Sequence, residues 1–253
     1  MNDILQQILS FFGHGFCHQY AERSFEAAGL CFSVCARCTG IYLGFIVTLV
    51  LVVLFSMIAR KRERVSGQSD AYRQKQDPPI KAGMPQVWAI VVGVLLIVPM
   101  AIDGVGSYIS LYETSNLVRF STGYLCGMGV AVIASGGIMS LWPHINQSQS
   151  AIISPRSLLA LLVASAALGA LYYETYPSMG ALAPFIVLAS HWFTVTVVLL
   201  LIVSASRFWS PSATTARRVL IVALCLLAAL VVLAVFSLLA NLIGTLFPWY
   251  VHL

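Results

Sequence analysis

The dominant pattern in this chain is a series of long apolar stretches separated by short polar segments. A helix that crosses the hydrocarbon core of a bilayer needs about 20 mostly apolar residues. Six stretches approach or exceed that length, at residues 39–59, 86–102, 116–142, 156–173, 182–206 and 217–246. The pattern therefore predicts an all-α, polytopic integral membrane protein with about six transmembrane helices. We expect Arg60 and Lys61 to end the first helix, and Asp103 with Gly104 to end the second.

The N-terminal segment, residues 1–13, has a different, amphipathic pattern. Its apolar positions recur at helical spacing: Ile4, Leu5, Ile8, Leu9 and Phe12. Such a pattern favours a short helix that lies at the membrane surface and does not cross it. Residues 14–37 follow, and we expect them to form a small polar cap, rich in Cys and His, in front of the first transmembrane helix.

The composition agrees with a membrane protein. Of the 253 residues, 59% are hydrophobic and only 9% are charged, whereas soluble domains have about 25% charged residues. The net charge of +5 does not indicate a nucleic-acid partner, because the basic residues gather in loops between apolar stretches, as membrane topology requires. The expected partner is the lipid bilayer.

The distribution of basic residues predicts an orientation in the membrane. Loop 60–85 contains seven Lys and Arg residues, and we expect it to be flexible. With six helices, this loop shares a side with residues 143–156 and 207–218, and that side has eleven basic residues. The opposite side has three, namely Arg23, Arg37 and Arg119. Because basic loops stay in the cytoplasm, we expect loop 60–85 there and the N-terminus outside.

The main candidate chemistry lies in the cap, where four of the six cysteines fall within 22 residues. Cys35 and Cys38 are three positions apart at the start of a helix, and His18 directly follows Cys17. Thiolate and imidazole groups with this spacing suit zinc or iron. We therefore expect an extracytoplasmic metal site built from Cys17, His18, Cys35 and Cys38.

The same cysteines fit two other interpretations. The N-terminal end of a helix and Arg37 would both lower the pKa of a thiol, so Cys35 and Cys38 also fit a redox dithiol that passes electrons to a membrane quinone. A disulfide between Cys17 or Cys31 and this pair is a related possibility at an oxidising face. In the remaining interpretation, the thiols are buried structural groups that cap the bundle.

Four polar residues on the same expected side are candidates for catalysis or anion binding: Arg23, Asp103, Asn116 and Arg119. Arg119 lies in the first turn of a helix, where a cation interacts unfavourably with the helix dipole. It therefore needs an anionic partner, and we expect Asp103 to be that partner. The alternative is that Arg119 holds a substrate phosphate or carboxylate, as in a lipid- or anion-handling transporter or scaffold that binds an anionic headgroup.

Two Gly-x-x-x-Gly motifs predict one helix contact. Gly40 and Gly44 lie in the first transmembrane helix, and Gly123 and Gly127 lie in the third. Small residues at this spacing allow two helices to approach closely in a membrane. We expect the first and third helices to pack together.

The polar motifs resemble those of DUF2085, a family of bacterial and archaeal membrane proteins. The matching residues are Cys17-His18-Gln19, Arg23-Ser24-Phe25 and the segment from Cys35 to Tyr42. The family's second and third blocks resemble Asp103-Gly104 and the residues Asn116, Arg119, Thr122 and Gly123. Ser107 stands about where the family usually has Gln.

This resemblance covers roughly residues 14–140 and implies a protein of the bacterial or archaeal cytoplasmic membrane, with no particular reaction attached. It predicts a DUF2085-like membrane domain at residues 1–142, with helices one to three and the basic loop. Residues 143–253 would then form a C-terminal region of three membrane helices.

Overall fold

The computed structural model describes residues 2–17, 19–65, 87–140, 155–205 and 215–246. The described chain begins with helix α1 (Asn2–His14), the single-turn 3-10 helix η1 (Ala21–Arg23), and strands β1 (Ser24–Ala27) and β2 (Leu30–Cys35). The long helices follow: α2 (Ala36–Val65), α4 (Val87–Tyr108), α5 (Asn116–Ser140), α7 (Pro155–Thr175), α8 (Leu182–Ala205) and α9 (Thr215–Leu246).

These long helices confirm the predicted fold class. Within the described residues, six helices are long and apolar enough to cross a bilayer. Large apolar side chains such as Leu95, Leu171 and Leu227 are exposed on their outer faces, which is the surface that a lipid environment favours and water does not. The chain is an α-helical membrane protein.

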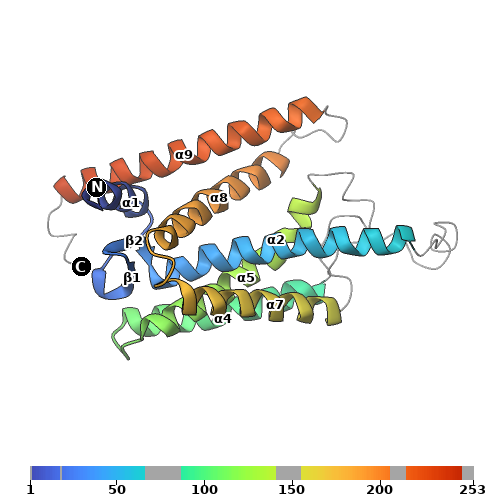
Figure 1. The fold of residues 1–253 in the computed structure, drawn as a ribbon, viewed down its shortest axis with the longest axis horizontal. Coiled ribbons are helices and arrows are strands. Elements are labelled where there is room, and N and C mark those ends of the chain that lie inside the picture. The colour runs from blue at the N-terminus through green and yellow to red at the C-terminus, as the bar shows by residue number, and fades with distance from the viewer. Residues whose placement is uncertain (1, 18, 66–86, 141–154, 206–214, 247–253) are drawn as a thin grey trace.

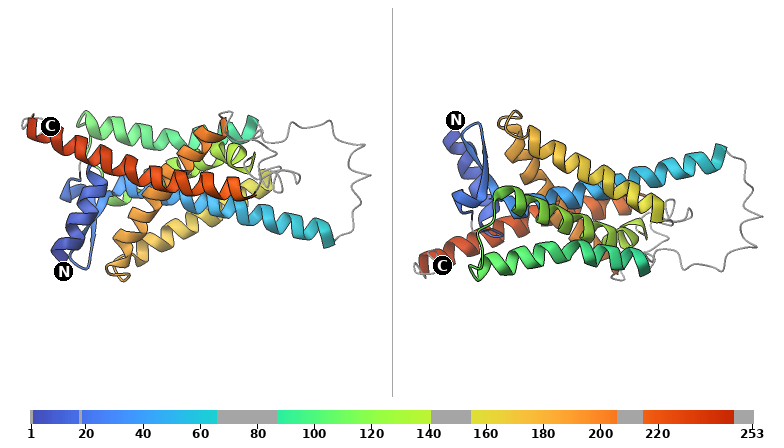
Figure 2. Two further views of the ribbon diagram at one scale, coloured as in Figure 1. Left: turned by 90° about the horizontal axis from the view of Figure 1, so that it is seen from above. Right: turned by 90° about the horizontal axis from the view of Figure 1, so that it is seen from below.

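Helix α2 is the centre of the bundle. It packs against α5, α7 and α8, while α4 packs against α5 and α9 packs against α8 (Figure 1). Helix α1 and the β1–β2 hairpin lie together at one end of the bundle, and α1 runs crosswise to the long helices (Figure 2). The position of α1 at the membrane surface stays a prediction.

The predicted contact between the first and third transmembrane helices, α2 and α5, is confirmed. A Cβ atom at Gly40 would overlap the backbone carbonyl oxygen of Phe120, and one at Gly123 would overlap that of Arg37. Gly127 lies equally close to the carbonyl oxygen of Ile41. The two backbones therefore touch, and only glycine fits at these positions.

The cap is a folded hairpin, which the sequence did not predict. Strands β1 and β2 are antiparallel, with Ala27 paired to Leu30, so the turn consists of Ala28 and Gly29. Both turn residues have positive φ, +53° and +72°, the geometry of a tight hairpin turn of type I′. The hairpin is also more apolar inside than the expected polar cap, because Phe25 packs against Phe32 and other aromatic rings.

Two predicted helix ends are wrong. Helix α2 begins three residues before the expected position and runs past Arg60 and Lys61 to Val65. Helix α4 continues through Asp103 to Tyr108, because the Asp103 side chain is buried against Arg37 of α2 and does not form a turn. Most of loop 60–85 lies outside the described residues, so its predicted flexibility stays a prediction.

Candidate functional site

Three cysteine side chains meet where the cap joins the bundle. Cys17 follows α1, Cys35 is the last residue of β2, and Cys38 lies in the first turn of α2. The three sulfur atoms lie within 4.8 Å of one another, and the backbone N–H of Cys35 donates a hydrogen bond to Sγ of Cys17 at 3.2 Å. Residues from three separate segments thus form one cluster, which we call the thiol cluster.

Two glutamine side chains hold the cap in this arrangement. Nε2 of Gln19 donates hydrogen bonds to the carbonyl oxygens of Ser33 in β2, at 2.6 Å, and of Ser10 in α1, at 3.0 Å. Oε1 of Gln6 accepts a hydrogen bond from the backbone N–H of Cys31 at 2.8 Å. These amides form hydrogen bonds with backbone groups of β2 and α1. They also fix the segment that contains Cys17 against the strand that ends at Cys35.

The electrostatics of the thiol cluster favour one thiolate. The pKa of the Cys35 thiol is lowered, first by a hydrogen bond with Cys17 and then by one with Cys38. The pKa of Cys17 is raised, mainly by the same hydrogen bond with Cys35. A negative charge on Cys35 is thus shared with two neighbouring thiols, as expected for groups packed close enough to bind one cation.

A buried histidine lies beside the cluster. The ring of His191 in α8 stacks on Tyr42, with 4.3 Å between ring centroids, and meets Phe16 edge-on at 4.9 Å. Tyr42 is one helical turn after Cys38, and Phe16 directly precedes Cys17. Both ring nitrogens of His191 are buried without a hydrogen-bond partner among the described residues. In the sequence, His191 lies inside an apolar stretch, and nothing local places it next to the cap.

The structure describes three of the four predicted metal ligands. The structure brings together Cys17, Cys35 and Cys38, whereas His18 lies outside the described residues and its role stays a prediction. Cys31 is in the same strand as Cys35 but is not a member of the cluster. All six cysteines are free thiols in this structure.

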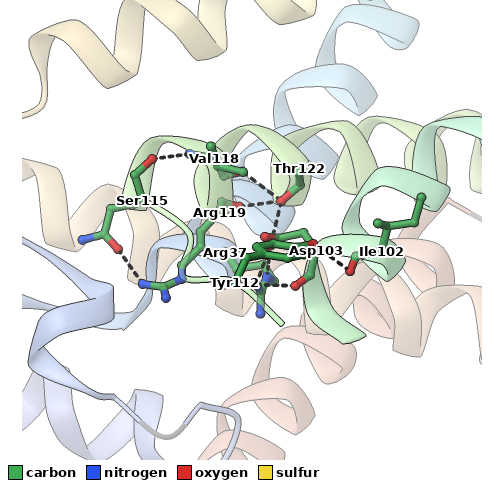
Figure 3. Close-up of polar contacts among 9 residues, drawn as sticks. Arg37, Ile102, Asp103, Tyr112, Ser115, Val118, Arg119 and Thr122 are labelled. Carbon is green, nitrogen blue, oxygen red and sulfur yellow. Dashed lines mark hydrogen bonds and ion pairs between the residues drawn. The ribbon is translucent and has the colours of Figure 1, made fainter. Parts of the chain in front are cut away.

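Asp103 pairs with Arg37, and the expected ion pair between Asp103 and Arg119 is wrong. Nε of Arg37 donates a hydrogen bond to Oδ2 of Asp103 at 2.8 Å, and Nη2 contacts the same oxygen (Figure 3). The hydroxyl of Thr122 in α5 donates to this oxygen at 3.3 Å. The carboxylate is only 3% exposed, so a charged and hydrogen-bonded partner is needed. Residue Arg37, between Cys35 and Cys38 in sequence, reaches it from the start of α2.

Arg119 is left with a neutral partner. Its Nη1 donates a hydrogen bond to Oδ1 of Asn116 at 3.2 Å, while Nδ2 of Asn116 points to the backbone oxygens of Glu22 and Ser24, at 3.4 Å each. Arg23 also lies on this side of the cap, with its guanidinium over the ring of Tyr20. Of the four polar candidates, Asp103 thus pairs with Arg37, while Arg23 and Asn116 lie with Arg119.

Comparison with known proteins connects these features to a family. Residues 17–67 and 78–133 match the family described as a predicted membrane protein, DUF2085. An uncharacterised protein of Methanothermobacter thermautotrophicus is 32% identical over 117 residues, which cover 46% of this chain and 82% of that protein. An uncharacterised protein of Methanocaldococcus jannaschii is 31% identical over 114 residues, which cover 45% of this chain and 58% of that protein.

No solved structure matches the chain. The two matched segments contain the three clustered thiols, both partners of the Arg37–Asp103 pair, and Arg119. With the likeness to the Methanothermobacter protein across most of that protein's length, this match shows that the chain belongs to the DUF2085 family.

Proposed function

We propose that the thiol cluster binds a metal ion, zinc or iron, at the end of the helix bundle. The observation that supports this proposal is the convergence of three sulfur atoms within 4.8 Å. In a tetrahedral site with zinc–sulfur bonds of about 2.3 Å, the sulfur atoms lie about 3.8 Å apart. A small contraction of the cluster would therefore place all three as ligands of one ion.

The fourth ligand in this proposal is His18, and a water molecule is the alternative. Three protein ligands with an open position are typical of catalytic zinc sites, whereas four protein ligands are typical of structural ones. The ion would join the segment after α1, the end of β2 and the start of α2. It would therefore stabilise the docking of the cap on the bundle in either case.

Protection from alkylation tests this proposal. In the purified protein with its metal bound, Cys35 and Cys38 should resist N-ethylmaleimide until a chelator is added, because metal-bound thiolates are not free to react. Cys31, which lies outside the cluster, should react to the same extent with and without chelator. Peptide mass spectrometry measures each site separately. Protection that ignores chelator and changes only with reductant would contradict the metal proposal.

That contrary result would favour the second candidate, a thiol oxidoreductase. Its support is the lowered pKa of Cys35 beside two other thiols. In that reaction, two thiols lose two electrons and two protons and form one S–S bond. A membrane quinone gains the electrons and protons and becomes the quinol. A lipid- or anion-handling role is a further candidate, and it would depend on the arginines near Arg119 and not on the thiols.

We also propose that the cap faces outward and that loop 60–85 faces the cytoplasm, on the basis of eleven basic residues against three. A maleimide that cannot cross the membrane should label a cysteine introduced at Asn2 in intact cells. It should not label one introduced at Ser69. The parent chain, treated in parallel, gives the background from native cysteines. Labelling at Ser69 without labelling at Asn2 would reverse the orientation and place the thiol cluster in the cytoplasm.

A further inference from the structure

A polar cavity of about 390 Å³ lies beside the Arg37–Asp103 pair, at the same end of the bundle as the cap. Its walls come from four parts of the chain: η1, the last turn of α4, the segment that joins α4 to α5, and the first turn of α5. Arg23, Thr114 and Arg119 supply hydrogen-bond donors, and Glu22 and Glu113 also line it. None of these residues belongs to the thiol cluster.

Two residues that line this cavity each have a buried donor with no hydrogen-bond partner in the described part of the chain. The Arg119 side chain is only 8% exposed, and its Nε has no hydrogen-bond partner among the described residues. The Thr114 hydroxyl is likewise buried without a partner. A buried donor without an acceptor is costly, and a buried cation without a counter-charge is more costly still. An acceptor in the cavity, reached by a rotation of these two side chains, would remove this cost.

No carboxylate among the described residues forms an ion pair with Arg119. Asp103, the expected partner of Arg119, instead accepts hydrogen bonds from Arg37 and Thr122 through Oδ2 (Figure 3). Glu22 and Glu113 are exposed at the cavity, where solvent screens their charges. Oδ1 of Asn116 accepts a hydrogen bond from Arg119, but it belongs to a neutral amide and does not balance the charge of the guanidinium. An anion in the cavity would supply the missing charge.

We propose that this cavity binds a phosphate group, either free or in a lipid headgroup. A phosphate has several acceptor oxygens that point in different directions, so it can accept hydrogen bonds from Arg119, Thr114 and Arg23 at the same time. Guanidinium groups are well suited to this ligand because their N–H groups form a planar fork. The cavity lies at the end of the membrane-spanning helices, which is also the depth of phospholipid headgroups.

The test uses the purified chain in a neutral glucoside detergent, with the melting temperature as the readout. Inorganic phosphate is titrated in one arm, and phosphatidylglycerol in mixed micelles in the other, with potassium chloride to match ionic strength. We expect a saturable rise in melting temperature. A rise with inorganic phosphate identifies free phosphate as a sufficient ligand, and a rise with phosphatidylglycerol alone identifies the headgroup.

Variants show whether the effect comes from this cavity. Arg119→Gln should weaken the apparent affinity about tenfold or more, because a charge-assisted hydrogen bond is lost. Thr114→Val keeps the charge of the cavity and should weaken the apparent affinity a few-fold. If Arg119→Gln does not fold, Thr114→Val is the variant that tests whether the ligand binds in this cavity. Arg156→Gln, at the opposite end of the bundle, should match the wild type.

Two results would overturn the proposal. One is the absence of a saturable rise with either ligand, which would mean that the cavity holds only water. The other is an equal response of wild type, Arg119→Gln and Thr114→Val. The metal content of Thr114→Val should equal that of the wild type, so either result leaves the metal proposal to be judged by its own experiment.

Discussion

Replacing Gly123 with leucine should prevent α5 from packing against α2 and should sharply lower the yield of folded protein. Even a Cβ atom at this position would overlap the carbonyl oxygen of Arg37, and backbone atoms cannot move aside as a flexible side chain can. Overpacking of a well-packed core already costs about 1–3 kcal/mol. Here the two helices must separate, so we expect a loss above that range. Gly44→Leu should behave in the same way, because its Cβ would overlap the carbonyl oxygen of Tyr124.

Gly104→Leu is the matched control, since a Cβ atom at Gly104 meets no other atom within 4 Å. This variant should elute and melt like the wild type in detergent. The measurements are the monodisperse fraction in size-exclusion chromatography and the melting temperature. Wild-type behaviour of Gly123→Leu in both measurements would mean that the close contact between α2 and α5 does not hold the bundle together.

Replacing Cys35 or Cys38 with serine should also destabilise the protein strongly, because metal binding at such a site contributes directly to folding. Structural zinc in small domains contributes roughly 10–16 kcal/mol of apparent binding free energy at neutral pH, and loss of one thiolate removes much of it. Chelator should therefore lower the melting temperature of the wild type toward that of Cys35→Ser. It should change the variant little.

Cys31→Ser is the control for this second prediction, because Cys31 is in the same strand but not in the thiol cluster. Its melting temperature and its response to chelator should both follow the wild type. An equal effect of chelator on the wild type and on Cys35→Ser would show that chelator acts elsewhere. In that case the thiols would not stabilise the fold through a metal.

The membrane helices could be predicted from the sequence because hydropathy is a local property. Each of the six predicted apolar stretches overlaps one of the described spans. The glycine motifs also identified the correct helix pair, since close backbone contact in a membrane requires small residues. Helix ends were less predictable. Asp103 resembled a turn residue because its partner, Arg37, is 66 positions away in the chain.

The hairpin could not be predicted from periodicity. Strand β2 is buried at four of its six positions and lacks the alternation of a half-exposed strand. Gly29, at positive φ, was the one local signal of a tight turn. For the site, the clustered cysteines pointed to Cys17, Cys35 and Cys38. Nothing local showed that Arg119 would have no ion-pair partner in the described ranges. That outcome depends on which arginine reaches Asp103 in three dimensions.

The amount of metal in the purified protein tests the central proposal most directly. Zinc and iron are measured by elemental analysis in wild type, Cys31→Ser, Cys35→Ser and Cys38→Ser, each purified without added metal or chelator. We expect close to one equivalent per chain in the first two proteins and almost none in the last two. A wild-type protein without stoichiometric metal, or equal metal in all four proteins, would contradict the proposed site.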